Sequence, residues 1–161
     1  DRYNLVFGFE VAHHIKQKSL LFSNIIRHLQ SEGLLVMADF IANGDFDIDH
    51  EETSSYFMTK QHWVEELSPN NLQLIGAIDV SQEVANYLYD ADFEENLNEL
   101  YQKSYDENIK SAFQSYNQLG KLLRKGLASY VLLTANKQEY LPQEQIYQLN
   151  QEILERLLSY S

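Results

Sequence analysis

The chain has 161 residues, of which 44% are hydrophobic and 12% aromatic, and its formal net charge is −12. This length and apolar content suffice for one globular domain with a hydrophobic core and exclude a disordered tail. The excess of acidic residues disfavours nucleic acid and anionic membranes as partners, because both are negatively charged. The absence of cysteine excludes disulfides, thiolate metal sites and a cysteine nucleophile.

The apolar runs are too short to cross a membrane as helices. The longest, such as LLVMADFIA and LASYVLLTA, fall well below the roughly 20 residues that a spanning helix needs. The sequence also opens without a basic and apolar leader. We therefore expect a soluble, cytoplasmic protein that does not contact a membrane.

The first part of the chain predicts two strands separated by a helix. Residues 4–9 form an apolar run with β-favouring Val and Phe, and apolar residues then recur at a helical period over 16–30. Gly33 follows in the position expected of a helix C-cap. Residues 33–40 predict a second strand, and because it is apolar on both faces, it indicates a parallel sheet covered by helices.

The remainder predicts a loop, two further strands and several helices. A polar loop is expected after Asn43, and a short amphipathic helix then follows, capped by Thr59 or an adjacent residue. Strands are expected over 72–80 and 127–137. Between them, residues 82–125 predict a helical excursion rich in aromatic residues, and a last helix begins at Pro142.

This order of elements predicts an α/β fold with a mainly parallel sheet and no internal repeat. We divide the chain into a sheet region with its flanking helices (1–81), the helical excursion (82–125) and the last strand with its helix (126–161). One feature of nucleotide-binding sheets is missing, since none of the six glycines shows GxGxxG spacing.

Several phrases resemble a known family. YNLVFGFEVAHHI, GLLVMADFI and GLASYVLLTANK resemble the C-terminal half of a class I S-adenosylmethionine-dependent methyltransferase. More narrowly, EVAHHIK, HEETSSYF and DVSQEVANYLYD are similar to the methyltransferase domains of modular polyketide synthases, and look more like the O-methylating type. The resemblance implies a Rossmann-like sheet whose last strand is antiparallel to the others.

The resemblance also implies the cofactor and the partners. The cofactor would be S-adenosylmethionine, and the partners an acyl carrier protein with a phosphopantetheine-linked acyl substrate and the neighbouring synthase domains. In that family the cofactor-binding glycines lie on the first strand of the domain, so they would precede Asp1. We therefore expect this chain to be part of a methyltransferase domain.

The resemblance assigns His13 the role of general base, at the carboxyl end of the first strand, where open α/β sheets bind ligands. An imidazole titrates near neutral pH and suits removal of a proton as a methyl group arrives. The alternative is that His13 or His14 begins a helix and bonds to backbone. Asp39, expected at the end of the next strand, would orient the imidazole. C-methylating relatives carry a Glu at about this place, and the alternative is that Asp39 caps the following loop.

Further site residues are predicted around this pair. Substrate contacts are predicted for Glu51, Glu52 and Tyr56 of HEETSSYF and for Tyr116 of the helical excursion. The alternative is that HEETSSYF is a solvated loop and that Tyr116 belongs to the ordinary core. Cofactor contacts are predicted for Phe9, Glu10 and His14. A metal site at His13, His14 and His50 is also conceivable, but helical His spacing is absent, so we predict no metal.

The leading functional hypothesis is O-methylation of a β-hydroxyl on a carrier-bound polyketide. C-methylation of the α-carbon of a β-ketoacyl intermediate is the alternative, followed by a non-catalytic scaffold that keeps the fold and by a metal-assisted methyltransferase. Residues 82–125 are predicted to form a lid that moves when substrate binds. The carrier protein is expected to dock on Lys121, Arg124 and Lys125.

Overall fold

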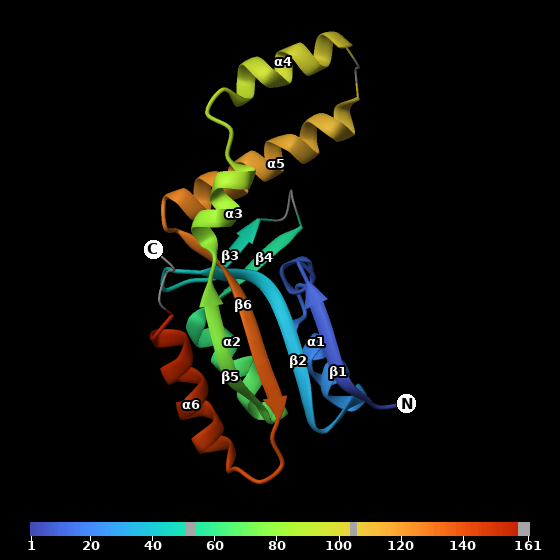
Figure 1. Ribbon diagram of the computed structural model, residues 1–161, viewed down its shortest axis with the longest axis vertical. Helices are drawn as coiled ribbons and strands as arrows, with labels where there is room; N and C mark the ends of the chain where they lie inside the picture. Colours follow the sequence, from blue (N-terminus) through green and yellow to red (C-terminus); the bar gives the residue numbers. More distant parts are fainter. Residues whose placement is uncertain (51–53, 104–105, 158–161) are drawn as a thin grey trace.

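The computed structural model describes residues 1–50, 54–103 and 106–157 and has a mixed α/β fold (Figure 1). Its strands are β1 (Tyr3–Phe9), β2 (Leu29–Ala42), β3 (Ile48–His50), β4 (Ser55–Thr59), β5 (Leu72–Asp79) and β6 (Ala128–Lys137). Its helices are α1 (Lys18–His28), α2 (Lys60–Leu67), α3 (Ser81–Leu88), α4 (Phe93–Lys103), α5 (Glu107–Arg124) and α6 (Gln143–Glu155), with short 3-10 helices η1 (Ala12–His14) and η3 (Ser68–Asn70).

The sheet is organised around the long strand β2. One edge of β2 pairs in parallel with β1 and, further along, with β4. The other edge pairs antiparallel with β6, which in turn pairs antiparallel with β5. The four strands expected from the sequence thus lie in one sheet with the last antiparallel to the others, which confirms that prediction.

Two local predictions were wrong. Gly33 does not cap a helix, because α1 ends at His28 and residue 33 already lies inside β2. A Cβ at Gly33 would lie 2.9 Å from the carbonyl oxygen of Gln30, so close approach of the backbone requires glycine there, next to the left-handed Glu32. The polar loop expected after Asn43 instead contains the antiparallel pair β3–β4.

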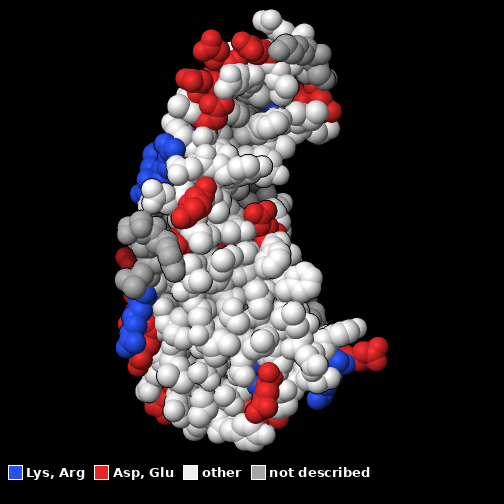
Figure 2. All heavy atoms as spheres, viewed as in Figure 1, with Lys and Arg blue, Asp and Glu red and all other residues white. Residues whose placement is uncertain are grey.

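The two faces of the sheet are covered differently. Helices α1, α2 and α6 pack on one face and bury the larger core, which includes Phe22, Trp63 and Leu154. Helices α3 and α5 cover the other face only near Phe40 and Tyr130. The rest of that face is open and carries few charged side chains in Figure 2, and its exposed apolar side chains include Leu5, Phe7, Phe9, Leu34, Ile78 and Leu132.

Helices α3, α4 and α5 lie beyond the carboxyl ends of β1, β2 and β5 (Figure 1). Helices α3 and α5 pack together, and Gly120 allows the contact because a Cβ there would lie 2.8 Å from the backbone nitrogen of Tyr89. Asp106 caps the start of α5, and Gly126 ends the segment in the left-handed conformation (φ 66°). Within the described residues, no helix combines the length and the hydrophobicity that crossing a bilayer requires.

Candidate active site

The carboxyl end of β1 carries a buried histidine–carboxylate pair. Nδ1 of His13 lies 2.8 Å from Oδ1 of Asp39, and the side chains are only 5% and 0% exposed. An ionised carboxylate can only accept, so Nδ1 carries the hydrogen and Nε2 carries a lone pair. Nε2 has no hydrogen-bond partner among the described residues, which leaves it able to take a proton.

Asp39 also builds the turn that presents His13. Its carboxylate accepts hydrogen bonds from the backbone N–H groups of Ala12 (2.7 Å), His13 (3.2 Å) and Phe40 (2.9 Å). These donors satisfy a charge that would otherwise be costly to bury. The same residue therefore holds η1 in place and orients the imidazole.

Asp39 does not end its strand, contrary to the expectation, because β2 continues to Ala42. The extension is paired on both edges, since Ala42 lies opposite Thr59 of β4 and Ala128 of β6. Asp39 therefore lies within paired sheet, and it caps η1 rather than the loop that follows β2. Its fixed backbone keeps the carboxylate in one position beneath the histidine.

Aromatic side chains surround the imidazole. His13 packs edge to face against Phe40 (5.1 Å between ring centroids) and Phe57 (5.8 Å). Phe40 in turn stacks on Phe57 at 4.8 Å and meets Tyr130 edge-on at 4.9 Å. These rings exclude water from one side of His13, and a drier environment strengthens its hydrogen bond to Asp39.

A second polar contact lies beside this aromatic group. The hydroxyl of Tyr130 donates to Oε1 of Glu10 at 3.2 Å. Glu10 has a left-handed backbone (φ 56°), and its N–H donates to the carbonyl of Ala38 at 2.8 Å. Burial, and then the charge of Glu10, raise the pKa of Tyr130, so its hydroxyl keeps its proton and donates to the carboxylate.

The other predicted residues are placed as follows. Nδ1 of His14 lies 2.9 Å from the carbonyl oxygen of Ser54. His14 therefore bonds to backbone, which is the alternative stated for it above. Tyr56 lies in β4, and its ring faces the ammonium of Lys16 at 5.1 Å. Phe9 is exposed at the end of β1, and Tyr116 is exposed on α5 without a described contact to His13. Glu51 and Glu52 lie outside the described residues.

Several residues around the pair were not predicted from the sequence. These are Phe40, Phe57 and Tyr130, whose rings lie around the imidazole, and Lys18, which donates to the carbonyl of Ala12 next to His13. The aromatic residues sit in strands, where a buried ring normally indicates only core packing. Lys18 had a clearer signal, since a lysine on the first turn of a helix that begins just after two histidines lies close to the site.

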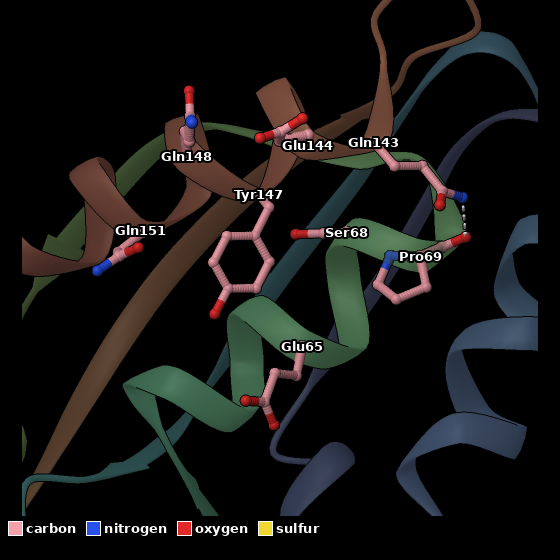
Figure 3. A pocket seen from close by; sticks show the side chains of 8 residues that line it. All are labelled: Glu65, Ser68, Pro69, Gln143, Glu144, Tyr147, Gln148 and Gln151. Atoms are coloured by element: carbon pink, nitrogen blue, oxygen red, sulfur yellow. Dashed lines mark hydrogen bonds between the residues drawn. The ribbon is translucent and has the colours of Figure 1, made fainter.

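A separate hollow of about 530 Å³ lies between α2 and α6. Figure 3 shows the ring of Tyr147 and the carboxylate of Glu65 in the space between these helices, and Gln143 donating to the carbonyl of Pro69. Neither His13 nor Asp39 lines it, so we do not assign it to the site. No cluster of three metal-ligating side chains occurs in the part of the chain that the structure describes.

The chain is similar to known proteins both in sequence and in fold. No family model matches the chain. The polyketide synthase ThaQ of Burkholderia thailandensis is 32% identical over 151 residues, which are 94% of this chain and 7% of ThaQ. The solved StiE O-MT is 43% identical with a TM-score of 0.85, covering 99% of this chain and 52% of that chain.

A second solved relative is the O-methyltransferase from a trans-AT polyketide synthase multienzyme of Brevibacillus brevis, in complex with S-adenosyl-L-homocysteine. It is 29% identical with a TM-score of 0.91, again covering 99% of this chain and 52% of that chain. The chain thus spans about half the length of these solved methyltransferases and a small part of ThaQ. Its similarity to the cyclopropane synthase MmaA2 from Mycobacterium tuberculosis, at 13% identity and a TM-score of 0.65, concerns the fold alone. Both the expected fold and the expected resemblance are confirmed, and the chain matches about half of a methyltransferase of the polyketide synthase O-MT type.

Proposed function

We propose that this chain supplies the general base and part of the substrate site of an S-adenosylmethionine-dependent O-methyltransferase in a polyketide synthase. The observation that carries the proposal is the His13–Asp39 pair, which is buried, correctly oriented and placed at the carboxyl end of a parallel strand. Ligands of open α/β sheets bind at this edge. The similarity to two solved O-methyltransferases supports the same assignment.

The proposed reaction needs a base and a place for the cofactor. S-adenosylmethionine would supply an electrophilic methyl group to a hydroxyl oxygen of the substrate, with the S–CH3 bond breaking as S-adenosylhomocysteine leaves. His13 accepts the hydroxyl proton at Nε2 as the oxygen attacks, and Asp39 stabilises the resulting imidazolium. The exposed ring of Phe9 and the carboxylate of Glu10 suit a cationic ligand, so the predicted cofactor contacts fit the residues present.

Further chain is needed to complete this enzyme. The sheet face that includes Phe7 and Leu132 is apolar and exposed over the described residues, whereas strands of this composition are normally covered on both faces. The solved relatives contain about as much chain again as matches here. We propose that this additional part covers the face and carries the cofactor-binding glycines.

The substrate is proposed to be an acyl chain on an acyl carrier protein. Helix α5 presents an apolar stripe at a helical period, formed by Ile109, Phe113 and Tyr116, all of them exposed. Acidic residues gather on the outer side of the helical excursion (Figure 2). This distribution supports a lid over the acyl chain, with the carrier protein docking near Lys121, Arg124 and Lys125 and other synthase domains nearby.

Between the two methylations, the O-methyltransferase relatives favour oxygen as the acceptor. The test uses the complete methyltransferase domain with labelled S-adenosylmethionine and a carrier protein loaded with either a β-hydroxyacyl or a β-ketoacyl chain. We expect label on the β-oxygen of the first substrate, located by mass spectrometry. Label on the α-carbon of the second would show C-methylation, and label on neither substrate would favour a scaffold.

A further inference from the structure

A buried lysine lies directly behind the His13–Asp39 pair. Lys18, on the first turn of α1, is only 5% exposed. Its Nζ donates to the carbonyl oxygen of Ala12 at 2.5 Å and to that of Tyr56 at 2.7 Å. These carbonyls belong to two segments far apart in the sequence, η1 and β4, so one ammonium connects the histidine turn to the strand beside it.

Lys18 and Asp39 bind the two opposite backbone groups of Ala12. The N–H of Ala12 donates to Asp39, and its carbonyl accepts from Lys18, so the peptide groups that flank this one residue are bonded on both sides. His13 is the next residue along. Phe57, which packs edge to face with the imidazole, follows Tyr56 in β4. Lys18 therefore fixes the backbone of both His13 and one of its aromatic neighbours.

We propose that Lys18 is a positioning residue for methyl transfer, whose buried ammonium holds the η1 turn against β4 and thereby holds the imidazole of His13 in register with Asp39. The inference rests on the proposed function, in which His13 is the base. Hydrogen bonds from a charged donor are roughly twice as strong as neutral ones, which suits an ammonium to this task.

The charge of Lys18 depends on pH in an accessible range. Burial lowers its pKa from 10.5 to about 8, although Asp39 on β2, Asp47 before β3 and Glu66 on α2 favour the charged form. Lys18 also lines a small hollow at the start of α1, together with His62, Lys16 and Ser19. Because the folded pKa is the lower one, the unfolded chain binds the extra proton between about pH 8 and 10.5, and folding stability rises with pH there. When Lys18 loses its charge, its hydrogen bonds to the η1 turn and to β4 weaken, and the imidazole of His13 is held less firmly. The protein stays folded, because stability rises over the same pH range.

The experiment follows the imidazole N–H of His13 by NMR in the complete domain, together with kcat and KM. In Lys18→Met we expect this resonance to broaden or vanish and kcat to fall on the order of 10-fold to 100-fold with KM little changed. Lys137→Met is the matched control, because Lys137 also donates to two backbone carbonyls, those of Ile26 and Leu29, away from the site. It should leave both the resonance and kcat unchanged.

Lys18→Arg keeps the charge but does not titrate in this range. In wild type the His13 resonance should show an inflection near pH 8 that is absent in Lys18→Arg. An unchanged resonance and kcat in Lys18→Met, or a persistent inflection in Lys18→Arg, would overturn the proposal. If Lys18→Met does not fold, the inflection in wild type and Lys18→Arg decides alone. A wild type without methyl transfer would refute the proposed function, while the NMR result would still test Lys18.

Discussion

Two histidine–aspartate pairs among the described residues differ in their surroundings more than in their geometry. His13–Asp39 joins η1 to β2 at 2.8 Å, and His62–Asp47 joins α2 to the segment before β3 at 2.6 Å. The first pair is 5% and 0% exposed, and the second is 34% and 42% exposed. The shorter contact is thus the more solvated one, so distance alone does not distinguish the buried pair from the exposed one.

The partners of each histidine explain the difference. His62 contacts a second carboxylate through Nε2, which lies 3.5 Å from Glu66, so neither ring nitrogen faces open space. Asp47 also accepts from the N–H of Thr59 at the start of α2. The exposed pair therefore connects α2 to the segment before β3, which is a structural role. Among the described residues, His13 contacts one carboxylate and the rings of Phe40 and Phe57, and its Nε2 has no hydrogen-bond partner.

The largest expected effect separates the two histidines by activity. In the complete domain, His13→Ala should lower the rate of methyl transfer on the order of 10² to 10⁴-fold, because it removes the proposed base. His62→Ala should stay within about threefold of wild type, since a solvated surface pair contributes little. Single-turnover assays with labelled cofactor measure both, and cofactor affinity by calorimetry should be nearly unchanged. Equal losses in the two variants would contradict the comparison.

A smaller effect is expected at the carboxylates. Asp39→Asn should reduce turnover less than His13→Ala, because Asp39 orients the imidazole and does not take the proton. It should also lower the free energy of unfolding by about 1–3 kcal/mol, since an amide cannot accept from all of the buried donors. Asp47→Asn, at the solvated pair, should cost about 1 kcal/mol or less. Urea titrations compare the two, and a greater loss in Asp47→Asn would reverse the assignment.

The smallest effect concerns the helix beside the exposed pair. Thr59 caps α2 by accepting from the N–H of His62 at 3.1 Å. Thr59→Ala should lower the free energy of unfolding by about 1 kcal/mol, and Thr59→Ser should recover most of it. Methyl transfer should not change in either variant. A loss of activity in Thr59→Ala at full stability would show that this region reaches the active site.

Much of the frame could be predicted because it depends on local pattern. Apolar runs of strand length and helical periodicity located the four long strands, and Thr59 and Gly126 marked helix ends by their chemistry. The antiparallel pair of β3 and β4 was missed because the polar residues around it indicated a loop. Gly33 was misread because the backbone approach that requires it involves Gln30, a contact that spacing does not reveal.

The site was predicted in part. The proximity of His13 and Asp39 followed from parallel pairing of two strands, and the structure has it at hydrogen-bond distance. The contribution of Tyr130 could not be predicted, because it reaches Glu10 only through the antiparallel insertion of β6 beside β2. Lys18 donates to the carbonyl of Tyr56 in β4, a strand that was itself not predicted. The contacts that were not predicted therefore depend on where β6 and β4 lie beside β2, which local patterns do not determine.

The position of β6 in the sheet also constrains how the protein folds. β6 is the last strand in the chain, yet it lies between β2 and β5 and touches both along its length. During synthesis, β2 and β5 must therefore wait for a partner that emerges after the entire helical excursion. Pairings between such distant segments are slow to form, and unpaired strand edges invite aggregation in the meantime. We expect truncation before β6 to abolish the sheet rather than shorten it.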